Sequence, residues 1–239
     1  KIIRVNGGFQ TDSDPPIIIG QLQFIKKQNG DPIEKTLSEI EKPEFQESMK
    51  KEAEGKLDKL QRLMNRDGGF DGPFSVRKLS DDMAVVEFKL NVGEAMGANL
   101  VNTVADYLGP VIGEKTGLES SFRILSNNAS DRCSRARVEI DPKTLATKTM
   151  DGDEVARRIV LGSRFAELDP NRAVTHNKGI MNGVIGIANA TGQDTRALES
   201  AAHFLASQKG RDPHSGQPRY GSLATWKINE NGFLEDEEY

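Results

Sequence analysis

The sequence predicts an α+β protein in which a small α/β sandwich domain is inserted in a larger, mainly helical domain with a few strands. Between residues 20 and 126, stretches with strand character alternate with amphipathic helical stretches. From residue 151 to 208 the apolar spacing is typical of helices, and short β-branched runs flank that region. We therefore expect residues 21–126 to form the small domain, and residues 1–20 and 127–239 to form the large one.

Short apolar runs bounded by turn residues predict the strands. Gly30-Asp31-Pro32 ends the second of them, and Asn229-Gly232 is typical of a hairpin turn after the last. The acidic residues Glu235–Glu238 are expected to be solvated. The expected strands cover residues 1–5, 17–25, 83–91, 122–125, 136–140 and 222–228.

Apolar residues three or four positions apart predict the helices. Gly109-Pro110 is a stop signal for the second helix, Asp151 is a suitable N-cap for the third, and Gly210–Arg219 is expected to be a loop. The expected helices cover residues 43–65, 94–108, 152–168, 177–190 and 194–208.

The composition excludes several classes of protein. Of the 239 residues, 28% are charged, and no apolar run approaches the roughly 18 residues of a membrane span. A net charge of −4 lacks the basic excess that favours nucleic acid. The single cysteine, Cys133, excludes an intrachain disulfide and suits a reducing cytosol. His176, His203 and His214 lack the spacing of metal ligands, so no metal site is expected.

The ends of the sequence also carry an expectation. The chain begins at Lys1 within an expected strand and stops just after an expected hairpin. We therefore expect it to be part of a longer protein.

Gly93–Asn99 lies at a predicted strand-to-helix junction. Free N–H groups and the positive end of the helix dipole favour an anion there, so the segment is a candidate cradle for a pyrophosphate. In the alternative, Gly97 only allows tight packing against a strand. Arg132, Arg135 and Arg137 either contact phosphates or are solvated.

Thr175–Gly183 places polar side chains and two glycines around Lys178, at the expected start of a helix. A lysine there opposes the helix dipole, which favours a role in stabilising a developing oxyanion over an ordinary surface role. Asp194 starts the next expected helix. Its local sequence favours an N-cap, and the alternative is a buried pair with Lys178 in which both pKa values shift.

Several of these segments together resemble one enzyme family. Arg172–Gly183 (RAVTHNKGIMNG), Ala190–Asp194 (ATGQD) and Tyr220–Leu223 (YGSL) closely resemble hydroxymethylglutaryl-CoA (HMG-CoA) reductase, of the soluble bacterial and archaeal type called class II. Gly93–Asn99 with Asn102-Thr103 resembles the family's dinucleotide motif D-A-M-G-A-N. Leu125-Ser126-Asn127 resembles a further segment on the cofactor side.

The resemblance implies an NAD(P)-dependent oxidoreductase that reduces HMG-CoA to mevalonate and CoA with two NADPH or NADH, or the reverse oxidation. It also implies isoprenoid biosynthesis, a cytoplasmic location, a ferredoxin-like cofactor domain, and a homodimer or higher oligomer with active sites between subunits. Lys178 would stabilise the oxyanion and Asp194 would tune that lysine. The resemblance places substrate contacts on Arg172, Thr175 and Asn182, and cofactor contacts on Glu94, Met96, Gly97, Asn99 and Asn127.

The sequence also departs from the family pattern. Glu94 stands where the family has aspartate, and the acidic residue that selects NADH in relatives aligns only loosely with Asp71–Pro73, so the choice between NADH and NADPH stays open. The family's catalytic glutamate and histidine would lie outside residues 1–239. We therefore expect this chain alone to be nearly inactive, and robust mevalonate formation by it would contradict that expectation.

Two other functions are compatible with the same residues. One is a non-catalytic module on the same scaffold that binds a nucleotide or acyl-CoA. The other is a structural dimerisation segment, which predicts no saturable binding of NAD(P)H or CoA thioesters.

Overall fold

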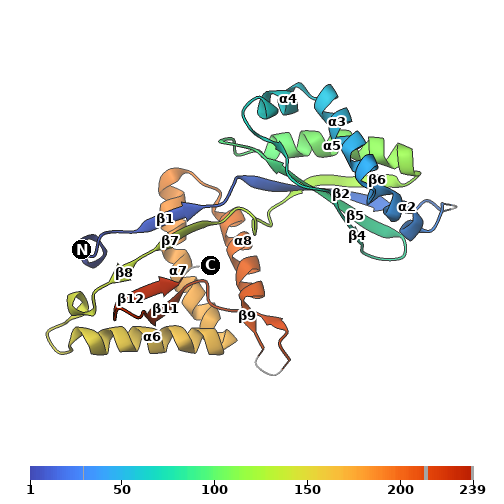
Figure 1. Cartoon of the computed structure of the whole chain (residues 1–239). Coiled ribbons are helices and arrows are strands. Elements are labelled where there is room, and N and C mark those ends of the chain that lie inside the picture. Colours follow the sequence, from blue (N-terminus) through green and yellow to red (C-terminus); the bar gives the residue numbers. More distant parts are fainter. Residues whose placement is uncertain (29, 213–214, 238–239) are drawn as a thin grey trace. The chain divides into compact units, whose positions relative to one another are not determined.

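The computed structural model describes residues 1–28, 30–212 and 215–237, and it combines helices with several small sheets (Figure 1). The chain divides into two compact units, which we call unit 1 (residues 1–13 and 133–239) and unit 2 (residues 14–132). Unit 2 thus starts before residue 21 and ends after residue 126. It starts earlier because β2 (Ile17–Ile25) crosses the expected first boundary as one continuous strand.

Unit 2 is built on one antiparallel sheet. Its strands are β2, β3 (Gly69–Phe70), β4 (Ser75–Lys78), β5 (Met83–Asn91) and β6 (Glu119–Ser126). The order is β3-β5-β2-β6, and β4 pairs with the same edge of β5 as β3. The predictions for residues 17–25 and 83–91 are confirmed, because alternate residues of these strands are buried as the period of a half-covered sheet requires.

Helices cover the buried side of this sheet. They are α2 (Ile33–Ile40), α3 (Pro43–Lys56), α4 (Asp58–Met64) and α5 (Ala98–Thr116). Helix α2 was not predicted, although Ile33, Leu37 and Ile40 are buried on one side of it. The predicted single helix 43–65 is wrong, since Leu57 adopts an extended conformation (φ −109°, ψ 99°) and packs against the core between α3 and α4.

The prediction of a helix over 94–108 is also wrong at both ends. Helix α5 begins at Ala98, passes through Gly109-Pro110 and ends at the left-handed Gly117. A proline within a helix loses one hydrogen bond, but here Leu108 and Ile112 are fully buried on either side of it. Tertiary packing therefore overrides the local stop signal.

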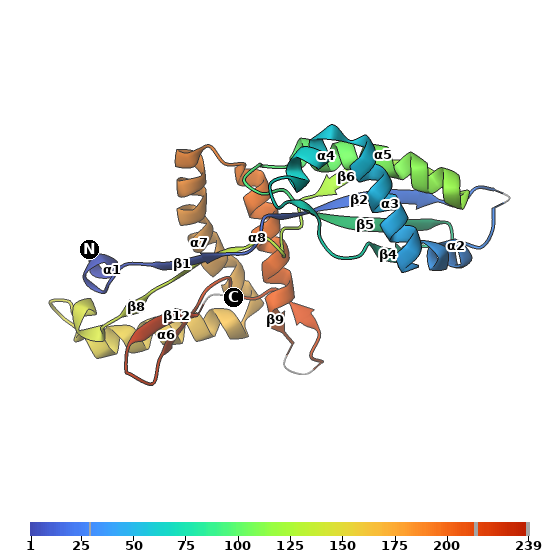
Figure 2. The ribbon, with the colours of Figure 1, turned by 45° about the horizontal axis from the view of Figure 1, so that its top comes forward.

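Unit 1 combines long helices with short strands (Figures 1 and 2). Residues 1–5 were predicted as a strand, but Ile2–Val5 form a short helix, α1, whose C-terminal Asn6 hydrogen-bonds back to the carbonyl oxygen of Ile2. Half-buried Ile3 packs on a small apolar cluster there. The other elements are β1 (Gln10–Ser13), β7 (Ser134–Arg137), β8 (Glu139–Ile140), a 3-10 helix (Pro142–Leu145), α6 (Gly152–Leu168), α7 (Pro170–Thr191), α8 (Thr195–Lys209), β9 (Gly210–Arg211), β10 (Pro218–Arg219), β11 (Thr225–Ile228) and β12 (Leu234–Glu237).

The short strands of unit 1 differ from the predictions in several places. The expected loop Gly210–Arg219 begins with β9 and ends with β10, which pair antiparallel with each other. The predicted strand 136–140 is interrupted at Val138, because β7 pairs with β1 whereas β8 pairs with β12. The predicted strand 222–228 starts only at Thr225. Glu235 and Asp236 are buried in β12 and not solvated; Glu238 lies outside the described residues.

Side-chain caps fix where the three long helices begin. Asp151 accepts a hydrogen bond from the Glu154 N–H at 2.9 Å, which confirms the predicted cap of α6. Asp169 caps α7, and Pro170 occupies its first turn. Helices α7 and α8 run in opposite directions and are joined through the left-handed Gly192 (Figures 1 and 2).

Candidate active site

Lys178 lies in the interior of α7 and not at a helix start. The cap at Asp169 starts the helix eight residues before Lys178. The argument that this lysine opposes the dipole at a helix N-terminus is therefore wrong, since that effect fades within the first turn. Any functional role for Lys178 has to come from what surrounds it on the helix surface.

Helix α7 presents one polar stripe to solvent. Arg172, Thr175, Lys178 and Asn182 recur at spacings of three and four, and all four side chains are exposed. Space is open beside the stripe, since a Cβ added at Gly179 or Gly183 would meet nothing within 4 Å. The stripe brings a guanidinium, a hydroxyl, an ammonium and an amide onto one face of α7. These groups belong to the expected substrate contacts Arg172, Thr175 and Asn182 and to the expected catalytic residue, Lys178.

The charge of this stripe is not compensated locally. Helix α7 contains no Asp or Glu. Among the described residues, neither Arg172 nor Lys178 has a carboxylate within ion-pair distance. Arg172 also lines a cavity of about 390 Å³ with His176 and Trp226, where α6, α7 and β11 meet. Two cations without a carboxylate partner, of which Arg172 lies beside this cavity, suit an anionic ligand.

Asp194 is the N-cap of α8. Its carboxylate accepts hydrogen bonds from the N–H groups of Arg196 (3.0 Å) and Ala197 (3.2 Å), which confirms the N-cap interpretation. Lys178 lies about 20 Å along α7 from the end that leads to Asp194, given 1.5 Å per residue. Both side chains are exposed, and no contact joins them within the described chain. The alternative of a buried pair within one chain is therefore wrong.

The candidate cofactor segment of unit 2 forms the turn between β5 and α5. Gly93 and Gly97 both have positive φ values, +59° and +89°. A Cβ on Gly97 would lie 2.6 Å from the Val92 side chain, so the backbone packs closely there and the packing interpretation of Gly97 holds. Glu94, Met96 and Asn99 project into solvent, and the Met96 side chain is 73% exposed.

The same turn also fits an anion. Helix α5 has no side-chain cap, and among the described residues nothing accepts a hydrogen bond from the N–H groups of Ala98 and Asn99. Uncapped N–H groups at the start of a helix of this length can bind a phosphate. Asn127, the fifth cofactor position, is exposed directly after β6, in the same unit.

Two interactions brace the loop that follows Asn127. Asp131, which had no assigned role, forms a 2.5 Å ion pair with Lys89 on β5, and this contact raises the pKa of Lys89. Arg132 donates a long hydrogen bond to the Met96 carbonyl oxygen at 3.5 Å. Arg132 thus holds the turn around Met96 from within unit 2.

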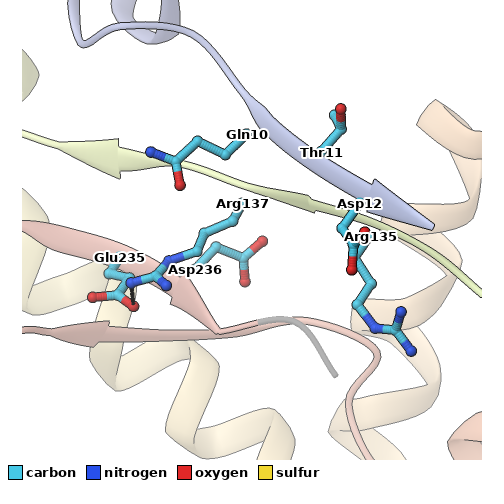
Figure 3. A pocket seen from close by; sticks show the side chains of 7 residues that line it. All are labelled: Gln10, Thr11, Asp12, Arg135, Arg137, Glu235 and Asp236. Atoms are coloured by element: carbon cyan, nitrogen blue, oxygen red, sulfur yellow. Dashed lines mark hydrogen bonds and ion pairs between the residues drawn. The ribbon is translucent and has the colours of Figure 1, made fainter. Parts of the chain in front are cut away.

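Arg135 and Arg137 line a second cavity, of about 370 Å³, beside the β1–β7 ribbon (Figure 3). Arg137 forms an ion pair with Glu235, whose side chain is only 7% exposed, and a longer one with Glu139. Since carboxylates compensate its charge, Arg137 is committed to structure and the expectation of a phosphate contact finds no support there.

Sequence reasoning assigned no role to Asn177, although it stands beside Lys178. This side chain is fully buried in α7 and hydrogen-bonds to Gly221 and Leu223. The available signal was an amide at an inward-facing helix position, where a polar group requires a partner.

Two absences concern the described residues alone. They contain no group of three or more His, Cys, Asp or Glu side chains arranged to hold a metal ion; His214 lies outside them. They also contain no helix that is both long and apolar enough to span a bilayer.

Comparison with known proteins identifies the family. The family model for hydroxymethylglutaryl-coenzyme A reductase matches residues 1–234. A reductase of that name from Archaeoglobus fulgidus is 33% identical over 236 residues, 98% of this chain and 49% of the relative. A probable one from Borreliella burgdorferi is 36% identical over 156 residues, 65% of this chain and 36% of the relative. The chain belongs to the HMG-CoA reductase family.

Solved structures agree with this assignment. A 3-hydroxy-3-methylglutaryl-coenzyme A reductase of Streptococcus pneumoniae superposes with a TM-score of 0.83 at 34% identity, covering 99% of this chain and 60% of that one. The same values hold for the class II enzyme from that organism bound to NADPH in open conformations. The present chain is therefore a segment of a bacterial or archaeal type of reductase. It spans about half the length of the relative from Archaeoglobus fulgidus, and that match covers 98% of the present chain.

Proposed function

We propose that this segment provides the substrate-binding helix and the nicotinamide-binding unit of an NADPH-dependent reductase that converts HMG-CoA to mevalonate and CoA. The observation that carries the proposal is the exposed stripe on α7, with two uncompensated cations among hydrogen-bonding side chains. The substrate bears a carboxylate, a hydroxyl and a thioester, and the stripe matches these groups in kind.

In this mechanism the side chains of α7 act on the substrate. Arg172 binds the carboxylate, while Thr175 and Asn182 orient the hydroxyl and the thioester. The chemistry supplied by a bound nicotinamide is hydride transfer to the thioester carbonyl carbon. Lys178 donates to the oxygen that becomes negative, because an ammonium fixed at that point stabilises charge that exists only after the transfer. Two hydrides and two protons in total convert the thioester to a primary alcohol and a free thiol.

Unit 2 is the proposed cofactor domain, with a ferredoxin-like arrangement. Strands β2 and β4 both pair antiparallel with β5, so they run parallel to each other with β5 between them. The connection from β2 to β4 through α2, α3 and α4 is therefore a crossover. The crossover through α5 joins β5 and β6 around β2 in the same way. We favour NADPH over NADH as the cofactor, because a class II relative of 34% identity was solved bound to NADPH. Its pyrophosphate would lie on the uncapped N–H groups at the start of α5, near Glu94, Met96, Gly97, Asn99 and Asn127.

Asp194 would tune Lys178 from a second copy of the chain. The two side chains are separated within one chain, as described above, and both are exposed. A homodimer, or a higher oligomer, supplies the missing contact across an interface. Sedimentation of the complete gene product tests this: a species that stays monomeric while turning over HMG-CoA would contradict it.

Substitution of Lys178 tests the proposed reaction. In the complete gene product, Lys178→Ala should lower kcat for HMG-CoA reduction about 100- to 1,000-fold, the usual loss of one oxyanion donor, and leave NADPH affinity unchanged. The matched control is Lys148→Ala, another exposed lysine of unit 1. Unchanged turnover in Lys178→Ala would remove the oxyanion role. Binding of HMG-CoA and NADPH without turnover by the unsubstituted protein would favour the non-catalytic module.

A further inference from the structure

The segment Arg219–Trp226, which we call the strap, connects all three long helices of unit 1. It reaches α6 twice: the Arg219 guanidinium donates to the carbonyl oxygens of Glu167 and Leu168, and the Trp226 N–H donates to the Ser163 hydroxyl at 2.9 Å. The strap therefore has both of its ends fixed to one helix.

Its centre is fixed to the other two helices. The Gly221 N–H donates to the Ala206 carbonyl oxygen of α8 at 2.8 Å, and Lys209 of α8 donates to the Leu223 carbonyl oxygen. The fit is close, because a Cβ on Gly221 would lie 2.6 Å from the Gly210 nitrogen. On its other side the strap faces Asn177 of α7.

Asn177 bonds to the strap as a neighbouring strand would. Its amide nitrogen donates to the Gly221 carbonyl oxygen at 2.9 Å, and its amide oxygen accepts from the Leu223 N–H at 2.9 Å. The side chain has 0% exposure, so it cannot exchange these bonds for water. Loss of either bond would leave a buried polar group unpaired, which is costly.

These two bonds fix the rotation of α7 about its axis. Successive residues of a helix are 100° apart, so an inward Asn177 turns Lys178 and the rest of its stripe toward solvent. We propose that Asn177 is a positioning residue, which holds Lys178, Arg172 and Thr175 at the angle where they meet the substrate. This inference rests on the proposed function and adds a residue that never contacts the substrate.

The test substitutes Asn177 in the complete gene product. Asn177→Ala should lower kcat/KM for HMG-CoA about 10- to 100-fold, since displacements near 1 Å in an active site have effects of that size. The Kd and binding stoichiometry for NADPH, measured by calorimetry, should change by less than about twofold, because unit 2 carries that site and a loss of folded protein would lower the stoichiometry. Asn177→Ser, which keeps a polar hydroxyl group at this buried position, should recover part of the loss.

A structural readout accompanies the kinetics. Hydrogen exchange of the Leu223 amide should accelerate in Asn177→Ala, while the Gly221 amide, bonded to Ala206, stays protected. Asn189→Ala, an exposed asparagine on the same helix, is the matched control and should change neither measurement.

The outcomes separate the two claims. If the unsubstituted protein does not reduce HMG-CoA, the proposed function fails. If it does and Asn177→Ala retains its kcat/KM, the positioning role alone is overturned. Loss of cooperative unfolding in both Asn177→Ala and Asn177→Ser would also overturn it, because Asn177 would then serve folding and not orientation.

Discussion

At the scale of single residues, several buried side chains have hydrogen-bond partners that lie far away in the sequence. Gln46 illustrates this in unit 2: it is buried, accepts from the Phe74 N–H at 2.8 Å and donates to the Phe74 and Ile40 carbonyl oxygens. It holds the end of the Asp71–Pro73 loop as Asn177 holds the strap. In both places a single side-chain amide both donates to a backbone carbonyl oxygen and accepts from a backbone N–H group.

Gly97 lies where the backbone leaves no room for a side chain. Gly97→Ala should lower the free energy of unfolding by about 2–4 kcal/mol, because it combines left-handed strain with a clash against Val92. NADPH affinity should fall with it. Gly93→Ala is the matched control, since its φ is also positive but a Cβ there meets nothing within 4 Å; we expect about 1 kcal/mol. Equal losses for both in urea denaturation would contradict this account.

At the scale of elements, helix starts are the best-defined features. Caps at Asp151, Asp169 and Asp194 each satisfy backbone N–H groups, and all three helices begin where those caps place them. The first turn of α6 adds an ion cluster, in which Arg157 and Arg158 both contact Glu154 at 2.7 Å. These hydrogen bonds lower the pKa of Glu154 to about 2.

The low pKa of Glu154 makes the stability of α6 depend on pH. The folded value lies below the ordinary value of 4.5, so the cluster stabilises the helix fully above pH 4.5, and this contribution is lost as pH falls toward 2. An NMR titration of the Glu154 carboxyl carbon should give a midpoint near 2, and the double substitution of Arg157 and Arg158 by Ala should return it toward 4.5. A midpoint near 4.5 in the unsubstituted protein would show that the cluster does not persist in solution.

At the scale of the whole molecule, the two units are stabilised unequally. The large apolar core, from Leu22 to Leu118, lies wholly within unit 2. The buried cluster of unit 1 consists of only Val138, Ile140, Ala156 and Leu234 among the described residues. Its helices carry exposed Leu161, Phe165, Leu168, Val174 and Ile187, the kind of apolar surface that associates with a partner.

Unit 2 should therefore fold by itself. Residues 14–132 expressed alone contain every strand of their sheet and should unfold in one cooperative transition in urea. They should also bind NADPH if unit 2 is the cofactor domain. A broad transition with strong binding of a hydrophobic dye would show instead that the core needs unit 1.

By itself the sequence determined what depends on neighbours along the chain. The period of apolar residues located β2, β5 and α6, the cap at Asp151 was readable, and the motif around Lys178 indicated the family. Only the tertiary structure decided that α5 continues through Pro110, that Glu235 is buried and that Asn177 bonds to residues 44 and 46 positions away. Hydrogen-bond partners and burial depend on which distant segments come into contact in the fold. A local sequence pattern does not specify those contacts.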